Sequence, residues 1–167
     1  MKADDAIFTN FADFFVKEKY WEEAKSKLIN TGDTTFLNKF KRESLNSPLK
    51  KNLRLIIDLF SINKLSLIIK EMEMNPVFVH SLKKMLSASP LSVLTSYHML
   101  QMPEIYLSVK EALKIEYRFT SRAQEYTDFQ EGIRSMIIDK DRNPVWKYPN
   151  IKEVPIQEVS DLLKPLS

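Results

Sequence analysis

The stretch "ALKIEYRFTSRAQEYTDFQEGIRSMIIDKDRNPVWK", residues 112–147, decides the fold. It begins inside the longest helical pattern of the chain, residues 104–126, in which apolar side chains recur at spacings of three and four. The residues that form this apolar stripe are Ile105, Val109, Ala112, Leu113, Tyr117 and Ala123. Asp128 and Glu131 then have the spacing of a capping box, which predicts a second helix that continues through "GIRSMII".

Gly132 lies inside this second helix, although the chain has only two glycines. A glycine in a helix interior costs about 1 kcal/mol relative to alanine. We therefore expect another backbone or helix to approach closely at this position. A charged turn, "DKDRNP", follows, then an extended arm punctuated by proline, and a last short helix in "IQEVSDLLKPL".

The rest of the chain also favours helices. The segment 61–74 predicts a capped helix with Leu65, Ile68, Ile69 and Met72 facing inward, and residues 77–89 predict another. Ser89-Pro90 opens the next, because proline in a first turn loses no hydrogen bond. "FADFFV" (11–16) allows a strand, and "LRLIIDLF" (53–60) is either a strand or the start of a helix. The predicted fold class is mainly α, with one or two short strands allowed near the N-terminus.

Composition excludes several kinds of site. The 167 residues include no Cys, so disulfides and thiolate zinc sites are excluded, and two His are too few for a His-rich metal site. Two isolated glycines do not make a phosphate loop or a dinucleotide turn. No apolar run reaches the roughly 18 residues of a membrane span. Asp4 and Asp5 lie where a mitochondrial presequence would avoid acids, so no presequence is visible.

Positive charge is concentrated in "KFKRESLNSPLKKNLR", residues 39–54. The formal net charge of +3 does not by itself indicate nucleic acid. A solvated face is the ordinary interpretation, and contact with a phosphate backbone is the alternative. The candidate RNA-binding residues are Lys39, Lys41, Arg42, Lys50, Lys51 and Arg54.

Residues 112–147 resemble the C-terminal helical region of 3-hydroxyisobutyryl-CoA hydrolases, in the enoyl-CoA hydratase/isomerase (crotonase) superfamily. The matching residues are Glu116-Tyr117-Arg118, Asp128-Phe129, Glu131-Gly132, Ile138 to Asp141, Pro144 and Trp146. The resemblance is firm from about residue 50 onward. It implies a junction segment at 1–50 that follows a crotonase core, and a helical C-terminal domain at 51–167.

The resemblance also implies where catalysis takes place. In this family a crotonase core upstream of the helices supplies backbone donors for the thioester oxyanion and acidic side chains for proton transfer. The chain carries none of those core motifs, so we assign it no catalytic residue and expect no activity of the chain alone. Lys140 is the candidate contact to the phosphates of CoA. A CoA thioester is expected to bind only if the chain is assembled with a core chain.

Two hypotheses of function follow from the resemblance. In the first, the chain is a structural subunit of a large assembly, the small subunit of the mitochondrial ribosome, with neighbouring ribosomal proteins and rRNA as partners. In the alternative, it is half of a split 3-hydroxyisobutyryl-CoA hydrolase of valine catabolism, whose core is on another chain. Both imply a mitochondrial location.

Overall fold

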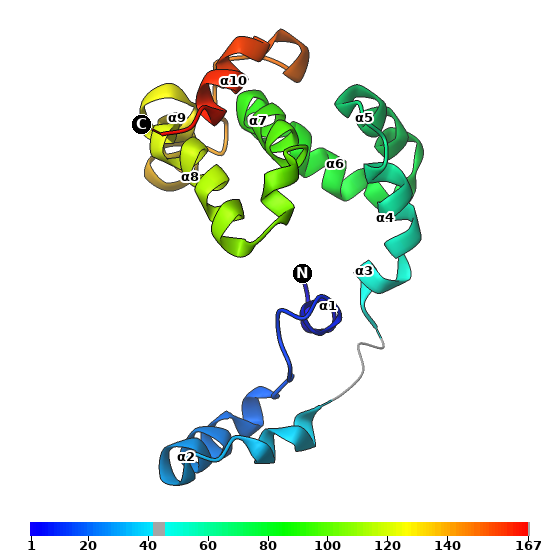
Figure 1. Cartoon of the computed structure of the whole chain (residues 1–167), viewed down its shortest axis with the longest axis vertical. Helices are drawn as coiled ribbons and strands as arrows, with labels where there is room; N and C mark the ends of the chain where they lie inside the picture. Colours follow the sequence, from blue (N-terminus) through cyan, green and yellow to red (C-terminus); the bar gives the residue numbers. More distant parts are fainter. Residues whose placement is uncertain (42–45, 167) are drawn as a thin grey trace. The chain divides into compact units, whose positions relative to one another are not determined.

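The computed structural model of the chain describes residues 1–41 and 46–166 (Figure 1). Its internal contacts divide it into an N-terminal unit, Met1–Ser61, and a C-terminal unit, Ile62–Ser167. The described residues contain helices and no strand. The mainly α fold class is therefore confirmed. The strand that the sequence allowed at 11–16 does not form, because that segment is irregular, and residues 53–60, for which a strand and a helix were both open, are helical.

The N-terminal unit has four described α-helices: α1 (Ala3–Phe8), α2 (Trp21–Thr31), α3 (Pro48–Lys51) and α4 (Leu53–Phe60). Two 3₁₀ helices, η1 (Glu18–Tyr20) and η2 (Thr35–Phe40), flank α2. A buried carboxylate ties α1 to α3, since Asp5 accepts hydrogen bonds from the Ser47 hydroxyl at 2.7 Å and the Leu49 amide at 3.2 Å. This link gives Asp5 a structural role that the sequence alone did not indicate.

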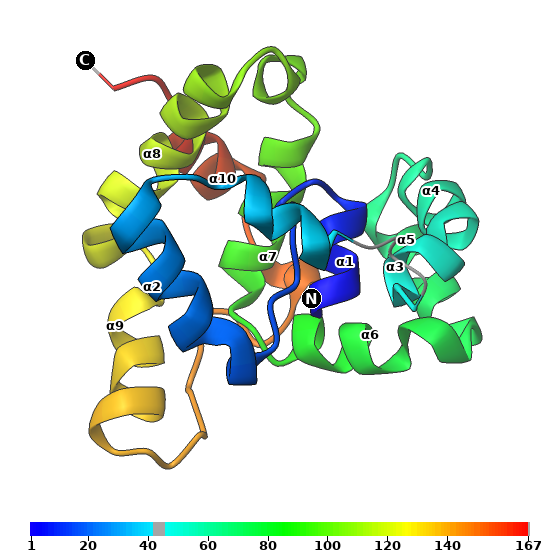
Figure 2. The same ribbon diagram turned by 90° about the horizontal axis from the view of Figure 1, so that it is seen from below.

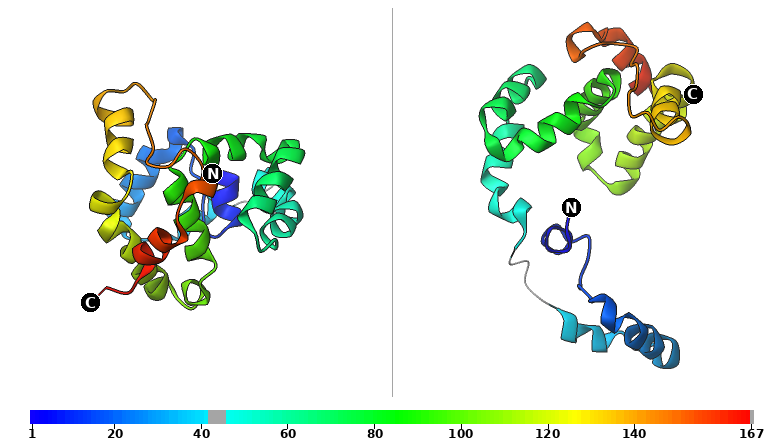
Figure 3. Two further views of the ribbon diagram at one scale, coloured as in Figure 1. Left: turned by 90° about the horizontal axis from the view of Figure 1, so that it is seen from above. Right: turned by 180° about the vertical axis from the view of Figure 1, so that it is seen from behind.

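The C-terminal unit contains α5 (Leu65–Met74), α6 (Val79–Leu86), α7 (Pro90–Leu100), α8 (Val109–Tyr126), α9 (Phe129–Ile133) and α10 (Ile156–Leu163). The shorter elements are η3 (Pro76–Phe78), η4 (Pro103–Tyr106), a π-helical segment η5 (Arg134–Ile138) and η6 (Ile151–Glu153). Figures 2 and 3 show the chain leaving η5 through a turn and returning to α10 along an extended arm. We call residues 139–142 the turn and residues 143–155 the arm.

The core of this unit joins α7 to the arm and α10. Leu91, Val154, Val159 and Leu162 are buried together, and Phe119 of α8 packs against them. Accordingly, α10 lies against both α7 and α8 (Figure 1). The Ser89-Pro90 start of α7 is confirmed, because the Ser89 hydroxyl accepts a hydrogen bond from the Ser92 amide. The four inward positions predicted between 61 and 74 are also confirmed as buried or half-buried, although that helix starts at Leu65 without a side-chain cap.

The predicted apolar stripe of α8 is largely exposed in this chain. Val109, Leu113 and Tyr117 are each more than half exposed. The buried side of α8 instead carries Ile115 and Phe119. Three-and-four spacing identifies an apolar face, and α8 has such faces on two sides. Only one of them is covered by the described residues of this unit.

The C-terminal unit leaves many large apolar side chains exposed. Six of them are each more than half exposed: Val109, Leu113, Tyr117, Met136, Ile137 and Ile138. Exposed apolar surface beyond scattered single residues marks an interaction site. No helix among the described residues is long and apolar enough to cross a membrane.

Candidate functional site

The junction of α8, α9 and the arm concentrates the buried and charged contacts of the C-terminal unit. Asp128 is buried, and its carboxylate accepts hydrogen bonds from the Ser89 hydroxyl at 2.5 Å and the Lys147 amide at 2.8 Å. Glu131 accepts hydrogen bonds from Arg134 and, at 2.7 Å, from the Val145 amide. Two neighbouring carboxylates on one helix therefore hold the start of the arm.

These contacts correct the predicted capping box. The Asp128 side chain makes no capping hydrogen bond to α9. Capping-box spacing places Asp128 and Glu131 on the same side of the first turn, where both can reach backbone amides. The amides that they bind belong to the arm, which lies 14 and 19 residues further along the chain. No sequence pattern in the arm indicates this contact.

Arg134 is the centre of an ion-pair cluster. Its guanidinium donates to Glu131, Asp139 and Asp141 at 2.7 Å each and to the carbonyl of Asn143 at 3.2 Å. The hydrogen bonds from Arg134 and Val145 lower the pKa of Glu131 to about 2. The same carboxylates raise the pKa of Arg134 above its ordinary value. The cluster thus fixes both ends of the turn to η5.

This cluster is expected to resist acid. Because the pKa of Glu131 in the fold, about 2, lies below its ordinary value of 4.5, the contact stabilises fully above pH 4.5 and is lost as the pH falls through 2. An NMR titration of the Glu131 carboxyl carbon, with exchange protection of the Val145 amide followed in parallel, measures this directly. A midpoint near the ordinary value would show that the cluster does not form.

The second helix changes form after Gly132. α9 ends at Ile133, and the π-helical segment η5 continues to Ile138. The atom that a Cβ on Gly132 would approach most closely belongs to the Trp146 ring of the arm, at 3.8 Å. The predicted close approach by a backbone or a helix is therefore wrong; an aromatic side chain lies there, at ordinary contact distance.

Substituting the two glycines is expected to give opposite results. Gly132→Ala should stabilise the C-terminal unit by about 0.5–1 kcal/mol, because the added methyl group fits and alanine favours helix. Gly32→Ala should destabilise the N-terminal unit by about 1 kcal/mol or more, because Gly32 ends α2 at φ 64°. Denaturant unfolding of both variants tests the pair. A loss of stability in Gly132→Ala would mean that Trp146 packs more tightly than the contact indicates.

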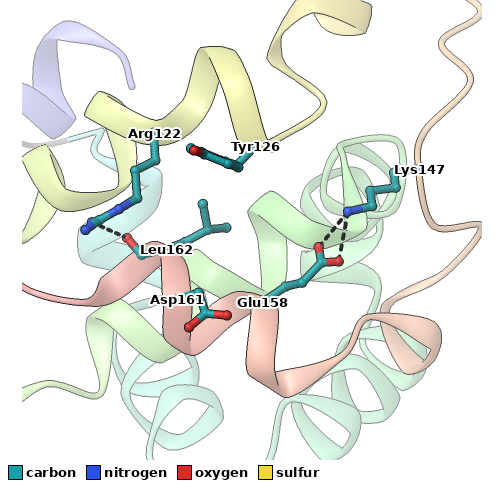
Figure 4. A pocket seen from close by; sticks show the side chains of 6 residues that line it. All are labelled: Arg122, Tyr126, Lys147, Glu158, Asp161 and Leu162. Carbon is teal, nitrogen blue, oxygen red and sulfur yellow. Dashed lines mark hydrogen bonds and ion pairs between the residues drawn. The ribbon is translucent and has the colours of Figure 1, made fainter.

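A pocket of about 370 Å³ lies between α8, the arm and α10. Figure 4 shows its lining: Arg122, Tyr126, Lys147, Glu158, Asp161 and Leu162. Lys147 pairs with Glu158 at 2.8 Å, and Arg122 donates to the carbonyls of Leu162 and Lys164 at 3.3 and 2.9 Å. Burial raises the pKa of Glu158, but the hydrogen bonds from Lys147 and Tyr148 outweigh it and hold that pKa below its ordinary value. The contacts of Lys147, Glu158 and Arg122 attach α10 to the arm and to α8, whereas Asp161 pairs with Lys164 at the end of its own helix.

Lys140, the candidate CoA-phosphate contact, lies in the turn between the two Arg134-bound aspartates. It is exposed, and its backbone has a φ of 56°; Arg142 has a φ of 55°. Residues other than glycine rarely adopt this conformation. Contact with CoA stays a prediction.

The candidate RNA-binding residues that the structure describes lie in or next to three short helices of the N-terminal unit: Lys39 and Lys41 in and directly after η2, Lys50 and Lys51 in α3, and Arg54 in α4. Lys39 in η2 pairs with Glu23, and Arg54 in α4 pairs with Asp58. Lys41, Lys50 and Lys51 are exposed and form no ion pair with a residue of the described ranges. Arg42 lies outside the described residues. No group of three or more metal-ligating side chains occurs in the part of the chain that the structure describes.

The sequence matches one family over almost its whole length. The sequence profile described as enoyl-CoA hydratase/isomerase matches residues 1–163. The mitochondrial 3-hydroxyisobutyryl-CoA hydrolase of Dictyostelium discoideum is 29% identical over 180 aligned positions, which cover 100% of this chain and 47% of that protein. The Mus musculus protein of the same name is 33% identical over 109 residues, 64% of this chain and 28% of that protein. The chain spans about half the length of the Dictyostelium relative. Its alignment with the mouse relative covers a smaller share of that protein.

Two solved structures are similar to this chain over almost its whole length. An enoyl-CoA hydratase from Rhodobacter sphaeroides matches 99% of this chain with a TM-score of 0.86 and 37% identity, over 48% of its own length. A carnitinyl-CoA dehydratase from Mycobacterium thermoresistibile matches 97% with a TM-score of 0.83 and 22% identity, over 47% of its own length, which shows the fold alone. This helical chain, which exposes apolar faces, thus superimposes on about half of a longer protein. The chain belongs to the enoyl-CoA hydratase/isomerase family.

Proposed function

We propose that the chain is the helical, non-catalytic part of a 3-hydroxyisobutyryl-CoA hydrolase, and that it acts by packing against a crotonase-type core carried on a separate chain. The observation that carries the proposal is the set of large apolar side chains that the C-terminal unit leaves exposed, among them Leu113, Tyr117 and Ile137. The names of the curated relatives support 3-hydroxyisobutyryl-CoA as the substrate of the assembled enzyme. The same names, which say mitochondrial, support a mitochondrial location for this chain.

In this proposal the core supplies the chemistry. Backbone donors stabilise the developing oxyanion of the thioester, and a positioned carboxylate transfers the proton. The helices described above supply rigid packing that completes the fold around the core. Lys140, exposed in the turn, is the contact of this chain to a CoA phosphate.

The test is complementation. The chain is co-expressed with the part of the Dictyostelium hydrolase that lies outside the matched region. Hydrolysis of 3-hydroxyisobutyryl-CoA by the purified pair is expected to exceed that of either part alone by at least about tenfold, since hydrolysis needs a correctly assembled core. A pair that does not form, or that is no faster than the Dictyostelium part alone, would contradict the proposal.

A structural role in the small subunit of the mitochondrial ribosome is the second candidate. The observation in its favour is the exposed positive charge of Lys41, Lys50 and Lys51. Lysines that contact rRNA phosphates make association salt-dependent. Under this candidate the chain co-sediments with the small subunit, and the double reversal Lys50→Glu and Lys51→Glu weakens retention in moderate salt. Unchanged retention would remove these lysines from an RNA contact.

A further inference from the structure

The π-helical segment η5 has an inverted pattern of burial. Ser135 is 0% exposed, whereas the three apolar residues that follow it, Met136, Ile137 and Ile138, are 58%, 60% and 69% exposed. A run of consecutive exposed apolar side chains is unfavourable in water unless a partner covers it. The polar side chain faces the unit to which the segment belongs, and the apolar ones face away from it.

The same segment is held rigidly. Arg134 opens η5 and bonds to both aspartates of the turn that follows. Within that turn, Lys140 and Arg142 both adopt left-handed backbone conformations. Such conformations cost energy for residues other than glycine and persist only where surrounding contacts enforce them. A binding surface that is ordered before binding loses less entropy when its partner arrives.

We propose that Met136, Ile137 and Ile138 form the docking surface for an apolar face of the crotonase-type core, and that Arg134 is the positioning residue that holds this surface in shape. The inference rests on the proposed function and names its interface. The core is the occupant because the matched half of the Rhodobacter sphaeroides enzyme leaves 52% of that chain to cover such a surface.

The docking surface is tested by Ile137→Asp, with Ile156→Asp as the matched control. Ile156 lies in the same unit, at the start of α10, and is 57% exposed. Binding of each variant to the Dictyostelium core part is measured by titration calorimetry. Ile137→Asp is expected to weaken binding by at least about 100-fold, as at an interface hot spot, and Ile156→Asp by no more than about threefold. Both side chains are exposed, so thermal unfolding of the two variants should match that of the parent chain.

The outcomes separate the two proposals. If the parent chain does not bind the core part, the proposed function fails. If it binds and Ile137→Asp binds equally well, the function stands and this interface is wrong. If the chain instead self-associates in sedimentation, and Ile137→Asp abolishes that self-association, the surface is occupied by a second copy and the inference is overturned.

The positioning role of Arg134 is tested by a double-mutant cycle. Arg134→Met is expected to weaken core binding by about tenfold or more and to accelerate amide exchange in residues 139–145. Arg134→Lys should recover only part of the loss, because an ammonium group has three donors and cannot replace the five hydrogen bonds that the guanidinium makes. If Arg134 acts through the docking surface, Arg134→Met adds little to Ile137→Asp. Fully additive losses would show that Arg134 only stabilises the unit.

Discussion

Asp128→Ala is expected to lower the free energy of unfolding of the C-terminal unit by about 3 kcal/mol, since it leaves one buried and one part-buried donor without an acceptor. Those donors are the hydroxyl of Ser89 and the amide of Lys147, which lie 39 and 19 residues from Asp128 in the sequence. The carboxylate therefore joins the start of α7 to the arm. Its loss should also release the arm, which is visible as faster amide exchange around Lys147. Urea denaturation of the isolated chain measures the first effect.

Asp128→Asn is the control for this prediction. An amide oxygen still accepts one of the two hydrogen bonds, although its NH₂ group cannot accept the other. The loss should therefore lie between zero and that of Asp128→Ala. Equal stability of the parent chain and Asp128→Ala would show that the arm is held by the apolar core alone.

Leu91→Ala is the second substitution with a large expected effect, about 3 kcal/mol, because a fully buried leucine is replaced and a cavity remains. Leu91 is 0% exposed and packs against Val154 of the arm and Val159 and Leu162 of α10. The matched variant Leu113→Ala removes the same atoms from α8, where the leucine is more than half exposed. It should change the stability of the isolated chain by less than about 0.5 kcal/mol.

The comparison of Leu91→Ala with Leu113→Ala tests which apolar faces are internal. Comparable losses in the isolated chain would show that the stripe of Val109, Leu113 and Tyr117 is packed within the unit. In a complex with the core, we expect Leu113→Ala to lower the stability of the complex if the core covers this face of α8. Denaturation of the isolated chain and of the complex separates the two cases.

Local signals in the sequence predicted the helices well. Ser89-Pro90 starts α7 as expected, because a hydroxyl acceptor before proline satisfies an early amide. Leu65, Ile68, Ile69 and Met72 face inward because one apolar stripe on α5 meets α6 within the same unit. Where a helix has one apolar face and a neighbour nearby in sequence, periodicity is sufficient.

The failures have a common physical cause. Periodicity shows that α8 has apolar faces, but it does not show whether this chain or a partner covers them. Likewise, the sequence shows that the carboxylates of Asp128 and Glu131 can accept hydrogen bonds from backbone amides. Only the folded structure shows that these amides belong to the arm. The inverted burial of Ser135 and Met136 was equally invisible, since a continuous helix was expected there. Contacts between distant segments decided each of these positions.

Hydrogen–deuterium exchange of the chain, alone and bound to the core part of the Dictyostelium hydrolase, measures whether the core covers the exposed apolar side chains of η5. We expect slower exchange on binding in residues 134–138, where the apolar side chains are exposed in the free chain. Unchanged exchange throughout that segment in a verified complex, with protection confined to other elements, would contradict it.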